Sequence, residues 1–348
     1  MTTQRTQAAE LSTVSPHGSD ALDERIVDAV VVGGGAAGLN GALILARSRR
    51  SVVVIDSGTP RNAPAEAVHG LLALDGTPPS EILATGREQL RRYGGRVVVG
   101  EVVAAEPAGP SKDGDPRFTI ALADGRTIVT RRVLVATGLL DVLPDVPGLA
   151  RHWGRTVLHC PYCHGWEVQD RAIGILATGP VSAVHALLFR QLSDDLVFFT
   201  QGIDLDDVSR ARFAARDIPI IETPIVEVVD DGDDALAGVR LADDRVVARD
   251  VVAVAAPLHA RTRGLEGLRL PILDVPNMGT SVDTGAAGST AVPGVWVAGN
   301  VTDLTAQVGA SAAAGALAGA EINKSLAIAD ADAAARRAAD GFHREASS

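Results

Sequence analysis

Aromatic residues and cysteines are scarce in this chain of 348 residues, and positive charges do not outnumber negative ones. Aromatic side chains make up only 3% of the sequence, so alanine and valine must supply much of the core. The formal net charge is −11 and the basic residues are scattered, which argues against a nucleic-acid partner, because phosphates require a basic face. No apolar run is long enough to cross a bilayer, and the polar beginning lacks the apolar segment of a signal peptide. We therefore expect a cytoplasmic protein with neither a nucleic-acid nor a membrane partner.

The two cysteines of the chain stand three positions apart, in Cys160-Pro161-Tyr162-Cys163. At the start of a helix this spacing puts both sulfurs on one side, within reach of a disulfide. Pro161 suits the first helical position, and a helix N-terminus stabilises a thiolate on Cys160. A structural cross-link gains little from closing so short a loop. The pair is therefore interpreted as a redox-active dithiol.

A glycine-rich turn lies between two apolar runs near the beginning of the chain. The strand-like run 26–32 leads into Gly33-Gly34-Gly35-Ala36-Ala37-Gly38, a helical stretch to Arg47 and a second strand that ends at Asp56. This order of strand, tight turn, helix, strand and acid is the dinucleotide fingerprint, with the pyrophosphate at the helix N-terminus and Asp56 at the adenosine ribose. The fingerprint alone does not distinguish FAD from NAD(P).

Two further strand-and-turn segments narrow this choice. One is Val133 to Gly138, with Thr137 and Gly138 in the turn, and the other is Gly294 to Asp303, followed by Gln307, Val308 and a small-residue helix over 309–322. With these motifs in this order, the chain from about Asp23 to Leu326 resembles the low-molecular-weight thioredoxin reductase family of two-domain flavoproteins.

The resemblance implies an α/β fold with two Rossmann-like, three-layer ββα domains, in which an inserted NAD(P)-type domain splits the FAD domain. We expect a disordered leader over 1–22, the FAD domain over 23–146 and 259–327, the inserted domain with the dithiol over 147–258, and a tail over 328–348. Relatives in this family are commonly homodimers.

The resemblance also implies which residues hold FAD. Asn300 stands where the family usually has an aspartate on the ribityl chain, and an amide oxygen still accepts that hydrogen bond. Arg61, Asn62 and His69 belong to a loop that passes beside the flavin, although Arg61 and Asn62 also fit a plain turn after Pro60. The expected FAD contacts are Gly33, Gly35, Ala36, Ala37, Gly38, Asp56, Arg61, Asn62, His69, Thr137, Gly138, Gly299, Asn300, Gln307 and Val308.

The second nucleotide turn, Thr178-Gly179-Pro180-Val181-Ser182-Ala183, departs from the family pattern. Thr178 and Pro180 replace two expected glycines, and Pro180 has no N–H to offer a phosphate. After the next strand, segment 200–204 is neutral to acidic, where NADPH-dependent reductases place basic residues for the 2′-phosphate. The use of NAD(P)H is therefore doubtful, and weak binding of NADH stays open.

The residue after the second cysteine is His164, where ordinary thioredoxin reductases have an aspartate. With Tyr162 and Trp166, this substitution resembles the FAD-dependent dithiol oxidases, which close disulfides in natural products and pass the electrons to oxygen. The resemblance gives Cys163 contact with the flavin, Cys160 exchange with substrate, and His164 proton transfer. A histidine here also fits a simple turn cap. Cys160, Cys163, His159 and His164 are all potential zinc ligands, but adjacent Cys–His pairs match the usual spacing of two separated ligand pairs poorly, so we expect no metal. His152, His185 and His259 have no evident partners and are expected to be ordinary surface or packing residues.

These observations favour an FAD-dependent dithiol oxidase with Cys160, Cys163 and His164 as catalytic residues, acting on a small dithiol with O2 as electron acceptor. The alternative enzyme is an NAD(P)H-dependent reductase of thioredoxin or of a small disulfide, with a thioredoxin-like protein as partner. A flavoprotein that controls a partner through its redox state is the third hypothesis, against which both cysteines argue.

Overall fold

The first sheet contains, as a central strand, the buried apolar run that precedes the glycine-rich turn. The computed structural model describes residues 26–109, 111, 114–232 and 235–345, so the expected leader over 1–22 lies outside the described residues. The sheet has the order β3-β2-β1-β6-β5-β4, with β19 also paired to β6, and its central β1–β2 and β1–β6 pairs are parallel. Its strands are β1 (Val27–Val32), β2 (Val52–Asp56), β3 (Arg96–Val99), β4 (Val102–Pro107), β5 (Phe118–Leu122), β6 (Thr127–Val135) and β19 (Val295–Val297).

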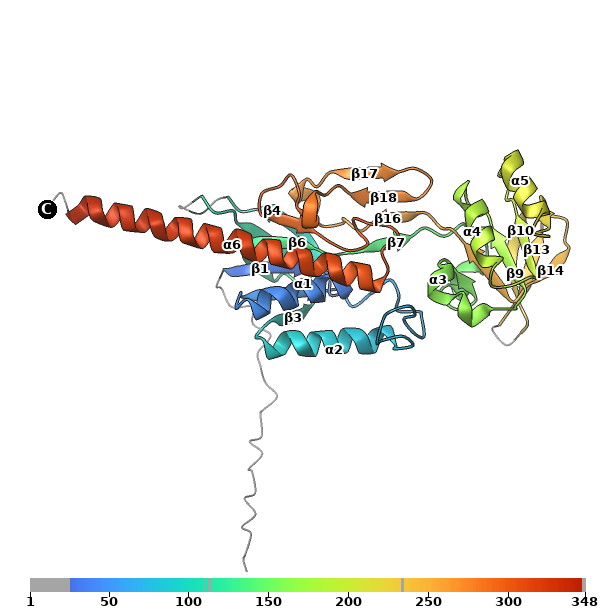
Figure 1. Cartoon of the computed structure of the whole chain (residues 1–348), viewed down its shortest axis with the longest axis horizontal. Helices are drawn as coiled ribbons and strands as arrows, with labels where there is room; N and C mark the ends of the chain where they lie inside the picture. Colours follow the sequence, from blue (N-terminus) through green and yellow to red (C-terminus); the bar gives the residue numbers. More distant parts are fainter. Residues whose placement is uncertain (1–25, 110, 112–113, 233–234, 346–348) are drawn as a thin grey trace, which may run out of the picture.

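Helices α1 (Ala36–Arg47), α2 (Pro79–Arg92) and α6 (Val308–Glu345) lie along one face of this sheet (Figure 1). Helices α1 and α6 approach closely, since a Cβ on Gly315 would lie 1.9 Å from the carbonyl oxygen of Ala37. The small residues of α6 are thus used for packing inside the chain. Helix α6 also continues without a break across residue 327 into the expected tail.

The two connections to the inserted part run side by side. β7 (Leu139–Asp141) leaves the first sheet and β16 (Leu258–Ala260) returns, and the two strands pair antiparallel, with Leu258 opposite Asp141. β17 (Ile272–Val275) and β18 (Gly279–Val282) complete this four-stranded sheet. The limits predicted near residues 146 and 258 fall beside these connections.

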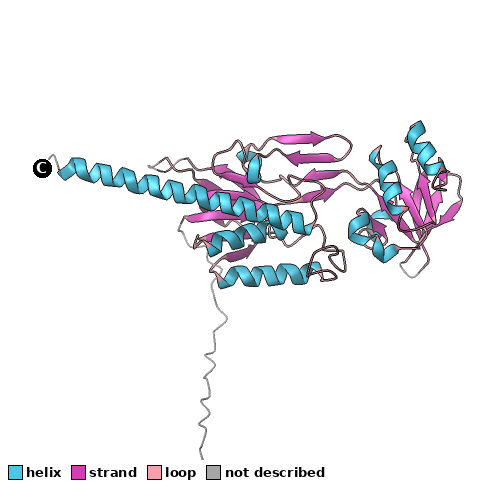
Figure 2. Cartoon of the chain, viewed as in Figure 1, coloured by secondary structure: helices cyan, strands magenta, loops and turns pink. Residues whose placement is uncertain are grey.

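The inserted part has its own parallel sheet, ordered β11-β10-β9-β15-β8, seen at the right of Figures 1 and 2. Phe189, Phe198 and Phe213 are almost fully buried there, so this core contains three of the six phenylalanines of the chain. The strands are β8 (Val157–Leu158), β9 (Ile173–Leu176), β10 (Leu196–Phe199), β11 (Ile220–Ile221) and β15 (Val251–Val254). The helices are α3 (Pro161–His164), α4 (Val181–Phe189) and α5 (Asp207–Ala214), and a separate antiparallel sheet contains β12 (Ile225–Asp230), β13 (Leu236–Leu241) and β14 (Val246–Ala248).

Each part of the chain is therefore a sheet with helices packed on it, as the predicted α/β fold with two Rossmann-like units requires. Among the helices of the described ranges, none is both long and apolar enough to span a membrane.

Candidate active site

A cavity of about 1650 Å³ connects the glycine-rich turn of the first sheet to the cysteine pair of the inserted part. Its lining includes fourteen of the fifteen residues predicted to hold FAD, all except Gly38, together with Cys160, Cys163 and His164. Pockets for one small molecule commonly measure about 300–1,000 Å³, so this cavity has room for a dinucleotide and a second molecule.

The turn after β1 has the backbone that a pyrophosphate site needs. Gly33 has φ +107°, and a Cβ there would lie 2.3 Å from the carbonyl oxygen of Ala136. A Cβ on Gly38 would lie 1.8 Å from the oxygen of Gly33, so only glycine permits this close packing. A Cβ on Gly35, the N-cap of α1, would meet no atom within 4 Å, which leaves open space for a ligand at the helix N-terminus.

Asp56 ends β2 at the edge of the same cavity. Its carboxylate accepts hydrogen bonds from the backbone N–H of Gly58 at 3.0 Å and from the guanidinium of Arg87 at 3.1 Å. Thr137 and Gly138 line the cavity after β6, where the Thr137 hydroxyl donates to the carbonyl of Arg261 at 2.6 Å. The ends of parallel strands β1, β2 and β6 thus converge on the ligand position, as in other open α/β sheets.

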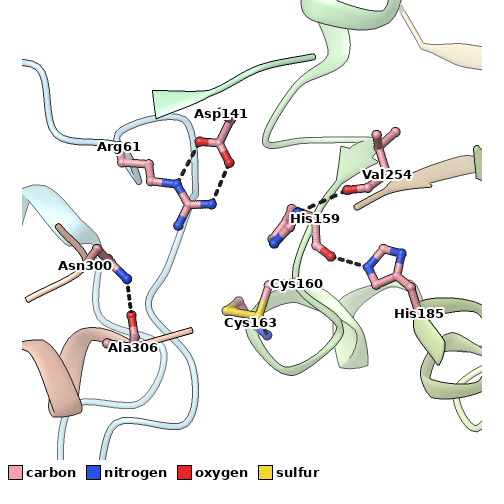
Figure 3. Close-up of a disulfide and its surroundings, with 9 residues drawn as sticks. All are labelled: Arg61, Asp141, His159, Cys160, Cys163, His185, Val254, Asn300 and Ala306. Atoms are coloured by element: carbon pink, nitrogen blue, oxygen red, sulfur yellow. Dashed lines mark hydrogen bonds and ion pairs between the residues drawn. A yellow bond between two sulfur atoms is a disulfide. The ribbon is translucent and has the colours of Figure 1, made fainter. Parts of the chain in front are cut away.

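Asn300 lies after β19, on the side of the cavity that faces the disulfide (Figure 3). Its amide nitrogen donates to the carbonyl oxygens of Asp303, at 3.1 Å, and Ala306, at 2.7 Å. Since both partners are acceptors, the amide orientation is fixed and its oxygen remains an acceptor for a ligand hydroxyl. The nearby Ser311 hydroxyl is buried, lines the cavity and has no partner within the described part of the chain.

These features fit FAD. The open space at Gly35, the fixed acceptor of Asn300 and the unpartnered Ser311 hydroxyl provide a helix N-terminus and polar groups for a polar dinucleotide. Gln307 and Val308 lie at the start of α6, and Gly299 precedes Asn300 with φ +85°.

Arg61, Asn62 and His69 belong to the loop after β2. The guanidinium of Arg61 makes a bidentate pair with Asp141, at 2.7 and 2.5 Å, beside the start of the connection to the inserted part (Figure 3). Backbone hydrogen bonds from Ala63 to Pro60 and from Ala65 to Asn62 form the plain turn that was the second reading of this segment. Arg61 and Asn62 also line the cavity.

Cys160 and Cys163 form a disulfide with a Cα–Cα distance of 5.2 Å. Cys160 is the N-cap of α3, Pro161 is the first helical residue, and the N–H of Cys163 donates to the sulfur of Cys160 at 3.1 Å. Helix α3 has a single turn and therefore no long helix dipole. The Cys160 sulfur is stabilised instead by the local hydrogen bond from the N–H of Cys163. Both cysteines are half-buried, and the disulfide faces the wall that holds Asn300 and Arg61 (Figure 3).

His164 lies at the end of α3, and its Nε2 atom is buried without a hydrogen-bond partner among the described residues. Burial lowers the pKa of His164, the charge of Glu167 opposes this, and His69 adds to the lowering. His69 belongs to the loop after β2, outside the inserted part, and its Nε2 lies 3.3 Å from Glu167 Oε1. A neutral imidazole with a free ring nitrogen therefore lies beside the disulfide.

Two further histidines, His159 and His185, also line this cavity. His159 donates from Nδ1 to the carbonyl of Val254 at 3.1 Å, and His185 donates from Nε2 to the carbonyl of His159. We expected His185 to be an ordinary packing residue. Its edge-on contact with Phe189 is packing of that kind, but α4 also places it behind the dithiol. The position of His159 directly before Cys160 was the signal that could have identified it.

The second nucleotide turn is closed by its own polar groups. The N–H of Thr178 donates to the hydroxyl of the fully buried Ser182 at 3.0 Å, and the Thr178 hydroxyl donates to Ala255 at 2.6 Å. The N–H groups of Ser182 and Ala183 donate to the carbonyls of Gly179 and Pro180. In the following loop, the Gln201 side chain is held by the backbone of Ile225 at 3.2 and 2.6 Å. The N–H groups of Thr178, Ser182 and Ala183 are thus used internally, and Pro180 has no N–H to offer a pyrophosphate.

The fold and the cavity define a two-domain disulfide oxidoreductase of the flavin-binding type. The chain belongs to the pyridine nucleotide-disulphide oxidoreductase family, whose model matches residues 27–320.

Individual relatives agree with this assignment. The chain is 35% identical over 285 residues to thioredoxin reductase tcpT of Claviceps purpurea, covering 79% of this chain and 86% of that protein. It is 37% identical over 190 residues to thioredoxin reductase sirT of Leptosphaeria maculans, where the match covers 51% of this chain and 56% of that one. Several of the fungal relatives are thus matched over only about half of their length, for example 45% and 57% in two further cases.

Solved structures show the same fold. The crystal structure of HlmI has 45% identity and a TM-score of 0.85, covering 91% of this chain and 98% of that one. An oxidoreductase from Agrobacterium tumefaciens has 33% identity and a TM-score of 0.80, covering 87% and 99%. The predicted fold class is therefore confirmed, and the protein is a thioredoxin reductase-like flavoprotein that uses FAD and acts on a sulfur group.

Proposed function

We propose that this protein is an FAD-dependent dithiol oxidase that closes an intramolecular disulfide in a small dithiol and uses O2 as electron acceptor. One contrast carries the proposal. The Cys160–Cys163 disulfide opens into the cavity that contains the FAD residues, whereas the second nucleotide turn closes on its own Ser182 hydroxyl. A dithiol therefore has a route to the disulfide, and a nicotinamide cofactor lacks a prepared one.

The chain's own groups account for the exchange steps. A substrate thiolate attacks Cys160, forms a mixed disulfide and releases Cys163 as a thiolate, with the neutral His164 taking the first thiol proton. The second substrate thiol then attacks the substrate sulfur of this mixed disulfide and releases Cys160. The closed product leaves, and both cysteines are reduced.

The electron balance requires one acceptor. Bound FAD supplies a two-electron acceptor for reoxidation of the cysteine pair, and O2 takes the electrons and leaves as hydrogen peroxide. The sum is one dithiol plus O2 giving one cyclic disulfide plus H2O2, and the two thiol protons end in the peroxide.

Exposed aromatic side chains beside the disulfide support an organic substrate with an apolar body. Tyr162 and Trp166 are 67% and 70% exposed, although five of the six phenylalanines are almost fully buried. Such exposed rings commonly mark binding surfaces. We expect a homodimer in the cytoplasm, as in the resemblance above, which light scattering of the purified protein would test.

The first experiment is an anaerobic titration of the purified yellow protein with dithiothreitol, NADH and NADPH. Dithiothreitol should bleach the flavin absorbance at one equivalent, and neither nicotinamide should do so at comparable concentration. Rapid bleaching by NADPH with no response to dithiothreitol would contradict the proposal.

The second experiment follows oxygen consumption with dithiothreitol. Cys163→Ser should reduce turnover at least 100-fold while retaining FAD, because Cys160 then has no disulfide partner to release when the substrate thiolate attacks. Ser193→Ala is the matched control away from the cavity, and it should leave turnover unchanged. Full turnover of the Cys163→Ser protein would exclude this route.

The alternative function is an NAD(P)H-dependent thioredoxin-disulfide reductase. The observation in its favour is the preserved β9–α4–β10 unit, together with the names of the fungal relatives. A thioredoxin-like protein would then be the partner. Reduction of an added thioredoxin by NADH or NADPH at a rate above that of dithiol oxidation would establish it.

A further inference from the structure

The oxidation of a dithiol by exchange releases two protons, one at each step. The attacking species is the thiolate, and an ordinary thiol has a pKa near 8.5, so each step benefits from its own proton acceptor near neutral pH. His164 provides one acceptor next to Cys163. The structure places a second histidine at the other end of the disulfide.

His159 precedes Cys160 and has a fixed tautomer. Its Nδ1 lies 3.1 Å from the carbonyl oxygen of Val254, and a carbonyl only accepts, so Nδ1 carries the proton. Nε2 is then a lone-pair acceptor. The ring lines the cavity on the side of the Arg61–Asp141 pair, next to the disulfide (Figure 3).

Neighbouring groups hold His159 in place and keep it neutral. The buried His185 donates from Nε2 to the backbone carbonyl of His159, which restrains the segment before Cys160. Burial lowers the pKa of His159 and the charge of Arg61 lowers it further, whereas Asp141 and the bond to Val254 act in the opposite direction. A neutral acceptor is the form needed for proton abstraction.

We propose that the two histidines divide the two protons, with His159 accepting the proton of the second, ring-closing thiol. This inference rests on the proposed dithiol oxidase function. Each histidine is adjacent in sequence to the sulfur that leaves in its step. His164 becomes positively charged beside the departing Cys163 thiolate, and His159 becomes positively charged beside the departing Cys160 thiolate.

The bonds balance in this scheme. In the first step a bond forms between the substrate sulfur and Cys160 Sγ, the Cys160–Cys163 bond breaks, and one proton moves to His164. In the second step the substrate disulfide forms, the Cys160–substrate bond breaks, and one proton moves to His159. Both protons finally leave with the electron pair in hydrogen peroxide.

The test separates the two steps in an anaerobic single turnover of the FAD-loaded protein at pH 6.5, where about 1% of an ordinary thiol is ionised. Dithiothreitol is the dithiol probe and 2-mercaptoethanol the monothiol probe, which performs the first step but cannot close a ring. Samples are quenched in acid and alkylated, and intact mass gives the amount of mixed disulfide on Cys160.

His159→Asn is the informative variant, because an asparagine amide keeps a donor for the Val254 carbonyl but lacks a base. We expect ring closure to slow about 100-fold, so that the dithiothreitol adduct accumulates, with the monothiol step within about twofold of wild type. His164→Asn should slow the monothiol step instead, without accumulation of the adduct. His259→Asn, which keeps a donor toward Thr280 away from the cavity, is the matched control.

Two results would overturn the assignment to His159. One is ring closure at the wild-type rate in His159→Asn, and the other is equal slowing of both probes, which a structural role produces. Failure of the proposed function itself looks different, because wild-type protein would then form no adduct and show no loss of flavin absorbance with either probe.

Discussion

His69 Nε2 lies 3.3 Å from Glu167 Oε1, and this pair joins the loop after β2 to the segment that follows the dithiol. The two residues are 98 positions apart and come from the two different parts of the fold. The side chains are 25% and 38% exposed, so water screens the attraction. The contact therefore contributes little to the stability of the protein.

The first prediction concerns this pair. A double-mutant cycle with His69→Gln and Glu167→Gln should give a coupling free energy of about 0.2–1 kcal/mol in urea unfolding, decreasing at high salt. The comparable pair Arg240–Glu227, which lies within the inserted part at 2.8 Å, provides a control cycle. A coupling several times larger would show that the contact is a main support between the two parts.

The second prediction concerns Asn300. Asn300→Asp, which installs the residue usual in the family, places a carboxylate against the carbonyl oxygens of Asp303 and Ala306. We expect FAD to dissociate at least tenfold more readily, because the repulsion displaces the 303–306 turn from the cofactor. The rise of flavin fluorescence on release measures the dissociation constant.

Asn323→Asp is the matched control for that change, since Asn323 accepts a hydrogen bond from Arg50 at 2.9 Å and a carboxylate suits that donor. FAD affinity should be unaffected in this variant. Unchanged or tighter FAD binding in Asn300→Asp would mean that the amide orientation described here is wrong.

The third prediction is a pH dependence of stability that comes from His185. Burial lowers its pKa to about 4, despite its hydrogen bond to the His159 carbonyl, whereas the unfolded chain has an ordinary value near 6.5. Between these values the unfolded state binds the extra proton, so stability falls as the pH falls from 6.5 toward 4. At pH 5 the loss from this group is about 2 kcal/mol.

His185→Gln tests this assignment because it retains a donor for the His159 carbonyl and cannot be protonated. Urea unfolding at pH 7.5 and pH 5 should show about 2 kcal/mol less acid destabilisation in the variant than in wild type. Equal pH dependence of the two proteins would assign the effect to other groups.

The fourth prediction concerns Asp115, which accepts hydrogen bonds from Arg117, Arg131 and the buried Arg132 at 2.5, 2.8 and 2.8 Å. Burial raises the pKa of Asp115, but the three arginines outweigh it and lower the pKa to about 2. Asp115→Asn should cost about 3 kcal/mol in urea unfolding, since it leaves the buried Arg132 without its charge partner.

The acid dependence of this cluster has the usual sign for a carboxylate. The contribution of Asp115 is complete above its unfolded pKa near 3.8 and is lost as the pH falls through about 2. The exposed pair of Asp124 and Arg126 is the control, and Asp124→Asn should have a clearly smaller effect. A loss in Asp115→Asn no larger than in this control would show that the cluster contributes little.

Local sequence patterns predicted the parts of the site that depend on neighbours in the chain. The turn at Gly33 and the pair Cys160–Cys163 are set by backbone sterics and spacing, so the fingerprint and the disulfide were readable from the sequence. The substitution of Pro180 likewise indicated that the second nucleotide turn had changed.

Features of side chains that depend on partners distant in the sequence could not be predicted from the sequence. The tautomer of His159 follows from Val254, and the orientation of Asn300 follows from a turn that only the folded chain defines. Past residue 327, Asp330 of helix α6 pairs with Arg50 and Arg131, contacts that no helical periodicity reveals. His185 was assigned to packing for the same reason, since its role depends on the backbone of His159.

Helix α6 starts at the cofactor cavity and ends far from it. Its 38 residues correspond to a rod about 57 Å long, and its outer part extends away from the rest of the molecule (Figure 1). A fluorescent label or surface anchor attached beyond Glu345 would therefore be remote from the dithiol, so the enzyme can be immobilised through that end for repeated substrate cycles.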